Sequence, residues 1–172
     1  MKSILLSTFL LITVLSNAQT VDIDNTGGTS GLIGLGANHY HASESIYTDA
    51  EIGNGNFTSA ATAIEKIAFK AVAVGAATSF GNVNIYLKNI PSTSTTLTTG
   101  TYTTAGYTLV FSGTVVINST GFTNITLSTT FVRNAGDNLQ LLVERSDNAA
   151  HAGFNYQTSN GNSVNLTLTT TR

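Results

Sequence analysis

The stretch Ser45-Ile-Tyr-Thr-Asp-Ala-Glu-Ile-Gly53, followed by the predicted strand Ile64–Val74, joins two differently patterned parts of the chain. A polar, glycine-rich part precedes it, and apolar residues recur at every second position after it. Within the stretch, Thr48 is a candidate helix N-cap and Glu51 stands three residues later, which is the spacing of a capping box. The glycine at its end is typical of a helix stop. The stretch therefore predicts one helical turn near residues 48–52 between two strands.

Apolar and polar residues alternate over a series of short runs downstream, a period typical of half-buried strands. Turn residues separate these runs. Gly113 in the run Leu109–Ile117 predicts a bend or bulge, and Ile125–Leu127 predicts a short strand. Short strands at regular spacing, with one helical turn, predict an all-β antiparallel β-sandwich of the jelly-roll kind. The residues expected to face inward include Ile67, Phe69, Ala71, Val83, Ile85, Leu87, Leu139, Leu141 and Val143, whereas Tyr86, Gln140, Leu142 and Glu144 are expected on the opposite face.

The first 18 residues have the features of a secretory signal peptide. One lysine precedes the apolar run Ile4–Leu15, and small residues stand where a signal peptidase cleaves, so we expect cleavage before Gln19. This apolar run is too short for a comfortable membrane span, and no other apolar run of that length exists in the sequence. We therefore expect a secreted or cell-surface protein, or a periplasmic one if no further sorting domain exists.

The mature chain, residues 19–172, has the length of a single domain. Glycine and polar residues at Asn25–Gly31 predict a loop. The Ser/Thr-rich segment Ser92–Tyr107 predicts a longer loop that overhangs one end of the sandwich and is either filler or a binding loop.

Charge and cysteine content exclude several classes of partner. Only 9% of the residues are charged, and removal of the signal leaves six basic residues against nine acidic ones, a net charge of −3. That balance argues against nucleic acid or an anionic membrane surface as a partner. The chain has no cysteine, so its stability must come from packing, with a bound metal as the alternative.

Acidic residues in turns are candidate calcium ligands, because calcium takes six to eight oxygens from carboxylates, amides and backbone carbonyls. The candidates are Asp49, Glu51, Asp137 and Asp147. The alternative is a capping contact for Glu51 and solvated turn carboxylates for the others. A transition-metal site is a weaker alternative, in which His39 and His41, two apart on a strand, would act with His151.

Tyrosines are the aromatic candidates for contact with a ligand such as a sugar. Tyr86 is expected opposite the core-facing Ile85, and Tyr102 and Tyr107 lie in or beside the long loop. We therefore predict that Tyr86, Tyr102 and Tyr107 bind ligand. For Tyr47 and Tyr156, a place at the edge of the core with a satisfied hydroxyl is the expected alternative.

No catalytic motif is present. The sequence has no Gly-x-Ser-x-Gly elbow, no cysteine nucleophile and no His-Glu-x-x-His zinc motif. A paired-carboxylate glycosidase could draw on Glu44, Glu51, Glu65 or Glu144. However, Glu65 precedes a lysine and Glu144 precedes Arg145, a pattern typical of charges that face solvent. We therefore expect no enzymatic activity.

Five runs match a known pattern in order and spacing over residues 33–156. They are Ser45–Gly53, Ile67-Ala-Phe69, Val83-Asn-Ile-Tyr-Leu87, Leu109-Val-Phe-Ser-Gly-Thr-Val115 and Asp137-Asn-Leu-Gln-Leu-Leu-Val143. Together they resemble a module of large secreted Bacteroidetes proteins, which recurs beside peptidases and fibronectin-type modules and in cargo of type IX secretion. That module is similar to the jelly-roll cleaved-adhesin domains of gingipain-like proteins. The resemblance implies a non-catalytic, adhesin-like accessory module, with structural calcium and a carbohydrate or host-protein ligand as expectations.

Two features depart from that pattern. Such modules carry an acidic Asp-Asn turn after the strand Leu139–Val143, whereas only part of it is present in Glu144-Arg-Ser-Asp-Asn148. No sorting domain follows Arg172, so we expect either a piece of a larger protein or a single module. The sequence predicts a non-catalytic module that binds a glycan or an extracellular protein. The alternative is a structural spacer of a larger secreted protein, with no ligand of its own.

Overall fold

The computed structural model describes residues 28–30, 41–54, 62–73, 78–97, 103–147, 155–158 and 166–168. The predicted signal peptide lies outside these ranges. No helix within them is long and apolar enough to cross a membrane. The elements are β1 (Gly28–Ser30), β2 (His41–Tyr47), α1 (Asp49–Asn54), β3 (Thr62–Ala73), β4 (Thr78–Ile90), β5 (Thr108–Ile117), β6 (Gly121–Arg133), β7 (Asn138–Arg145), β8 (Asn155–Thr158) and β9 (Leu166–Leu168).

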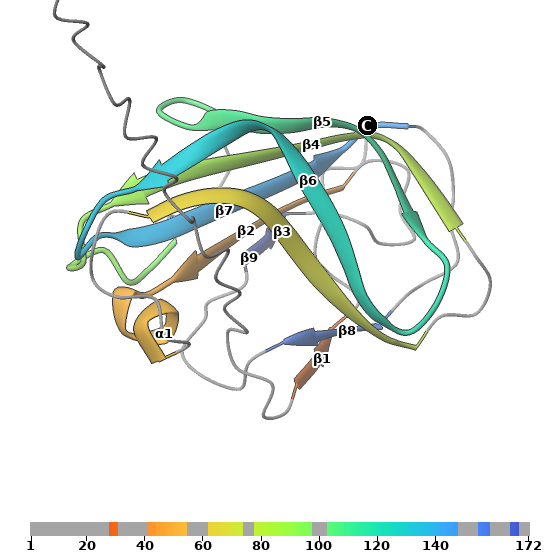
Figure 1. The fold of residues 1–172 in the computed structure, drawn as a ribbon, viewed down its shortest axis with the longest axis horizontal. Helices are drawn as coiled ribbons and strands as arrows, with labels where there is room; N and C mark the ends of the chain where they lie inside the picture. The colour runs from red at the N-terminus through yellow and green to blue at the C-terminus, as the bar shows by residue number, and fades with distance from the viewer. Residues whose placement is uncertain are drawn as a thin grey trace, which may run out of the picture.

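The strands pair in a nested order that builds two antiparallel sheets (Figure 1). The innermost pair is β4 with β5, and outward along the chain β3 pairs with β6, β2 with β7 and β1 with β8. One sheet has the order β1-β8-β3-β6, and the other has the order β5-β4-β7-β2-β9. This nesting is the topology of a jelly roll, with β9 added beside β2. The predicted all-β class, antiparallel sandwich and jelly-roll arrangement are confirmed.

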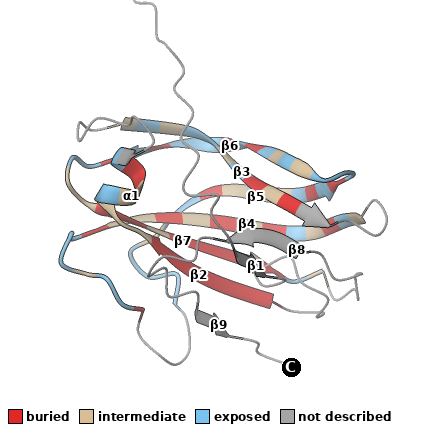
Figure 2. Ribbon diagram, turned by 90° about the horizontal axis from the view of Figure 1, so that it is seen from below, coloured by how far each residue is buried: buried red, intermediate tan, exposed pale blue. Residues whose placement is uncertain are grey.

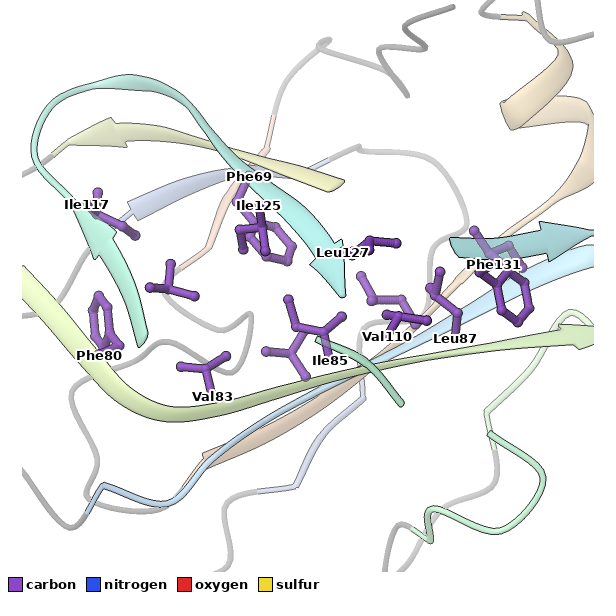
Figure 3. Close-up of a cluster of buried hydrophobic side chains, with 14 of the residues drawn as sticks. Phe69, Phe80, Val83, Ile85, Leu87, Val110, Ile117, Ile125, Leu127 and Phe131 are labelled. Carbon is purple, nitrogen blue, oxygen red and sulfur yellow. The ribbon is translucent and has the colours of Figure 1, made fainter. Parts of the chain in front are cut away.

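Alternate residues of both sheets meet in one apolar core (Figure 3). Full burial of each large apolar side chain stabilises the fold by about 1.5–3 kcal/mol, so this cluster takes the place of disulfides in a chain without cysteine. The predicted inward residues of β3, β4 and β7 all belong to the core or pack in it. Its buried members are Ile52, Phe69, Ala71, Phe80, Val83, Ile85, Leu87, Val110, Val115, Ile117, Ile125, Leu127, Phe131, Leu139, Leu141 and Val143.

The bulge predicted at Gly113 lies instead in the facing strand β4, and a second one lies earlier in β5. Phe80 pairs with Val115 and Val83 with Gly113, so the extra residue belongs to β4, where Asn82 has a φ of 49°. A second register shift in β5 turns Val110 into the core. A Cβ atom on Gly113 would lie 3.2 Å from Cζ of Phe111. The glycine therefore makes room for the Phe111 ring and does not form the bulge.

Helix α1 begins as its sequence predicts. Glu51 N donates to Thr48 Oγ1 over 3.2 Å, and the Glu51 carboxylate accepts from Thr48 N over 2.8 Å. These reciprocal bonds are a capping box, which satisfies backbone donors that the first turn leaves without partners. Ile52 then points from the helix into the core, so the single turn closes one end of the sandwich.

Two strand predictions were wrong. β1 lies inside Asn25–Gly31, predicted as a loop from its glycines, because β8 supplies a pairing partner far along the chain. β6 is 13 residues long, whereas a short strand was predicted around Ile125–Leu127. Its pairing with β3 breaks after Thr126 and resumes at Phe131. The exposed residues 128–130 in this interval are all polar. The apolar alternation in the sequence therefore ends before them, although the strand continues.

Candidate ligand-binding face

The five-stranded sheet has an inner face toward the core and an outer face on the opposite side. Cross-strand partners share a face, so Tyr86 on β4, Leu142 on β7 and Glu44 on β2 form one row across the outer face. Leu142 is fully buried and Glu44 is only 9% exposed. Figure 2 shows β2 buried along almost its whole length. The outer face is therefore covered over Leu142 and Glu44, although alternation alone predicts contact with solvent, whereas Tyr86 at the end of the row is partly exposed.

Tyr107 reaches over this row from the segment just before β5. Its hydroxyl donates to Glu44 Oε1 over 2.7 Å. Its ring meets the Tyr86 ring edge to face, with centroids 6.4 Å apart and an interplanar angle of 74°. Lys88 Nζ lies 5.3 Å from the Tyr107 ring centroid. We call Glu44, Tyr86, Lys88 and Tyr107 the tyrosine face.

A tight turn holds Tyr107 in this position. Tyr107 N donates to Thr104 O over 3.1 Å, and Gly106, the third residue of the turn, has a φ of +77°. A positive φ at that position is typical of a type II turn and favours glycine. A Cβ atom on Gly106 would lie 3.5 Å from Cε of Lys88, so the lysine packs closely against the turn. The turn and the lysine together fix the Tyr107 ring.

Burial is the largest cause that raises the pKa of Tyr107, and the hydrogen bond and negative charge of Glu44 raise it further. The phenol therefore stays protonated as a donor, which suits a carboxylate partner. Burial also raises the pKa of Tyr47. Tyr47 packs against the core, as predicted for a residue at the edge of the core.

Both described ends of the predicted loop Ser92–Tyr107 pack on the outer face. Leu97 forms a small buried apolar cluster with Ile46 on β2 and Ile90 on β4. Asn138 supports the same segment, because its Nδ2 donates to the carbonyl oxygens of Ser92 and Ser94. The loop thus covers part of the sheet, and Tyr107 marks where it rejoins the strands.

The structure brings together two of the three predicted ligand-binding residues, Tyr86 and Tyr107. Tyr102 lies outside the described residues. Glu44 and Lys88 were not predicted as ligand contacts. A period-two pattern places Lys88 on the same face as Tyr86, so the sequence held that signal. Nothing local in the sequence indicates that Glu44 meets Tyr107, 63 residues away.

The predicted calcium ligands are divided between the two ends of the sandwich. Asp49 forms an ion pair with Arg133, whose Nη2 also donates to the Asp137 carbonyl over 2.8 Å. The Asp137 side chain accepts from Asn134 Nδ2 over 2.9 Å, and Glu51 makes the capping contacts described above. No three acidic or histidine side chains gather around one point in the described part of the chain. Calcium binding stays a prediction.

Asp147 lies at the opposite end with Arg145. Its Oδ1 is 3.6 Å from Arg145 Nε, and its Oδ2 accepts from Gly81 N over 3.0 Å. Arg145 was predicted to face solvent, but its side chain is fully buried and lies 5.4 Å from the Phe80 ring centroid. The prediction was wrong because Arg145 follows core-facing Val143 by two residues and shares its face. His41 is buried beside it, while His39 and His151 lie outside the described residues.

Glu44 and Glu144 are diagonal neighbours on the outer face. Glu144 pairs with Ala42, two residues before Glu44 on the same side of β2. Diagonal residues of this kind lie about 7–8 Å apart. Two carboxylates on one face are the groups that a glycosidase pair needs, although Glu44 is already bonded to Tyr107.

Comparison with known proteins yields no relative from which a role could be taken: no protein-family model matches this chain, and neither a curated protein nor a solved structure matches it significantly.

Proposed function

We propose that this chain is a secreted, non-catalytic binding module, adhesin-like in role, whose tyrosine face binds a glycan. The observation that carries the proposal is the meeting of Tyr86 and Tyr107 on one face of a rigid sheet. Two clustered rings favour a binding role over a spacer, for which scattered single rings are expected. The signal-peptide pattern and the resemblance to cleaved-adhesin modules support the secreted, adhesin-like part of the proposal.

The chemistry of the tyrosine face suits a sugar. An aromatic ring offers an apolar surface to the C–H groups of a pyranose, and adjacent polar groups bond its hydroxyls. Tyr86 and Tyr107 supply the rings, and Lys88 and the neighbouring Gln140 supply polar groups on the same face. The Tyr107 turn is held by Glu44 before any ligand arrives, so little side-chain freedom is lost on binding.

A glycosidase is the second candidate, because Glu44 and Glu144 are diagonal neighbours on one face and inverting enzymes use two carboxylates that flank the scissile bond. It ranks lower because Glu44 is buried and bonded to Tyr107, whereas a catalytic carboxylate must reach the scissile bond.

A glycan array with the predicted mature chain, residues 19–172, tests the proposal. Tyr86→Ala removes one ring, and we expect binding to weaken by about tenfold or more, because loss of an aromatic anchor costs on the order of 2 kcal/mol. Val132→Ala is the control, because Val132 is an exposed apolar side chain, 56% accessible, on the other sheet. Each array is repeated with calcium and with a chelator, and bound glycans are assayed for new reducing ends.

The outcomes separate the candidates. Specific binding that Tyr86→Ala abolishes and Val132→Ala preserves supports the proposal, and its loss with chelator adds calcium to it. New reducing ends that disappear in Glu144→Gln would replace the binding module with a glycosidase. Absence of all binding by the folded protein would favour the structural spacer.

A further inference from the structure

The outer face of the four-stranded sheet carries two lysines in line. Lys66 and Lys70 alternate with core-facing residues of β3, so both point away from the core. Four residues at about 3.3 Å each place their Cα atoms about 13 Å apart. Between them lie the exposed Ala68 and its cross-strand partner Asn124, and Phe122 is the partner of Lys70. We call Lys66, Lys70, Phe122 and Asn124 the lysine face.

The lysine charges are available to a ligand. In the described part of the chain, neither Lys66 nor Lys70 has a carboxylate within ion-pair distance. Lys70 Nζ lies 5.4 Å from the centroid of the Phe122 ring, which is half exposed. By contrast, Arg133 and Arg145 are buried, and each is paired with an aspartate. The buried cations serve the fold, whereas the lysine face is open.

Most of the described acidic residues lie away from the lysine face. Apart from Glu65, which is exposed beside Lys66, the described acidic residues lie on β2, α1, β7 or the turns flanking β7. They are Glu44, Asp49, Glu51, Asp137, Glu144 and Asp147. The lysine face is therefore positive in a chain whose predicted mature form has a net charge of −3, and an anionic partner is directed to this face.

We propose that the lysine face binds an anionic polysaccharide. The two ammonium groups contact carboxylate or sulfate groups spaced along the polymer, and the Phe122 ring packs on the apolar side of a sugar between them. Such a site is separate from the tyrosine face, on the opposite side of the sandwich, so one module can hold two glycan chains.

The geometry favours a polymer over a lipid surface. Recognition of anionic membranes typically uses a cluster of about four to eight basic residues, and this face has two. A single half-exposed ring also offers little apolar surface for insertion into a bilayer. Two lysines whose Cα atoms lie about 13 Å apart along a strand instead suit charges that repeat along an extended chain.

Binding of polygalacturonate and of its carboxyl-reduced, neutral form to the predicted mature chain tests the proposal. Lys66→Gln and Lys70→Gln are each expected to weaken polygalacturonate binding about fivefold, and the double variant about 25-fold. Thr114→Asp is the matched control, because it lowers the net charge by the same one unit at an exposed position of β5, on the other sheet and outside the tyrosine face. The neutral form is expected to bind no more weakly to the double variant than to the wild type.

Three results would overturn the proposal. The double variant could bind polygalacturonate as the wild type does, or Thr114→Asp could weaken binding as much as either lysine change. Vesicles rich in anionic phospholipid could bind in a manner that depends on both lysines while polygalacturonate does not, which would assign the face to membranes. Tyr86→Ala leaves this site intact, so its binding to neutral glycans reports on the tyrosine face alone.

Discussion

Replacing Tyr107 with phenylalanine tests how the tyrosine face is built. The change removes one hydroxyl, which donates over 2.7 Å to a carboxylate that is only 9% exposed. Hydrogen bonds to charged groups contribute about 1.5–3 kcal/mol, and the remaining carboxylate loses a partner where water has little access. We therefore expect Tyr107→Phe to lower the free energy of unfolding by about 2 kcal/mol, a sizeable part of the 5–15 kcal/mol typical of a domain.

Urea denaturation at neutral pH measures this loss, and a double-mutant cycle assigns it to the pair. Glu44→Gln keeps the size of the side chain and removes its charge. If the two groups interact as described, the double variant is more stable than the sum of the single losses predicts, with a coupling of about 1–2 kcal/mol. Additive losses would refute the inference that Glu44 anchors the Tyr107 turn.

Alkaline titration gives an independent check. The folded-state pKa of Tyr107 is raised above the ordinary value of 10.0, so above that pH the folded state retains a proton that the unfolded chain releases. Stability that is fully present below pH 10.0 is therefore lost as the pH rises beyond it. Tyr107→Phe removes the part of this alkaline loss of stability that Tyr107 causes. The part caused by Tyr47, whose pKa is also raised, remains. Identical alkaline slopes for wild type and variant would contradict the assignment.

Three further substitutions test other parts of the fold. Asp49→Asn leaves buried Arg133 without its charged partner, and because the Asp49 side chain is 33% exposed, we expect a loss of about 1–2 kcal/mol in urea; an unchanged midpoint would contradict it. Gly113→Ala places a Cβ atom 3.2 Å from the Phe111 ring, so thermal denaturation should show a loss of about 1 kcal/mol. Gly106→Ala strains a backbone with a φ of +77°, and we expect about 1–2 kcal/mol of destabilisation together with weaker glycan binding; unchanged binding would show that the turn does not position Tyr107.

Local chemistry in the sequence predicted the local structure. The capping box formed by Thr48 and Glu51 needs residues only three apart, and period-two alternation placed Ile85 and Leu87 in the core. Alternation also placed Tyr86 on the outer face, where it contributes to the candidate site. These features depend on neighbours in the chain, so their signals do not require knowledge of the topology.

Long-range contacts set what the sequence did not predict. Asp49 and Arg133 are 84 residues apart, and Glu44 and Tyr107 are 63 apart. Neither pair has a spacing that indicates contact, because the nested order of strands brings them together only after folding. Leu142 was expected opposite the core and is nevertheless fully buried, because alternation reports which face a side chain is on and not what covers that face.

The nested topology also explains how the sandwich protects an uncharged edge. No charged residue lies between Lys88 and Arg133, a stretch that contains β5 and all of β6 except its last residue. Each is the last strand of its sheet, and edge strands commonly carry charges that oppose pairing with another chain. Here the break in β6 pairing provides a substitute: Ser128 Oγ, within that break, donates to the Val110 carbonyl of β5 over 3.0 Å. The irregularity that shortened the predicted strand thus occupies a backbone acceptor at the neighbouring edge.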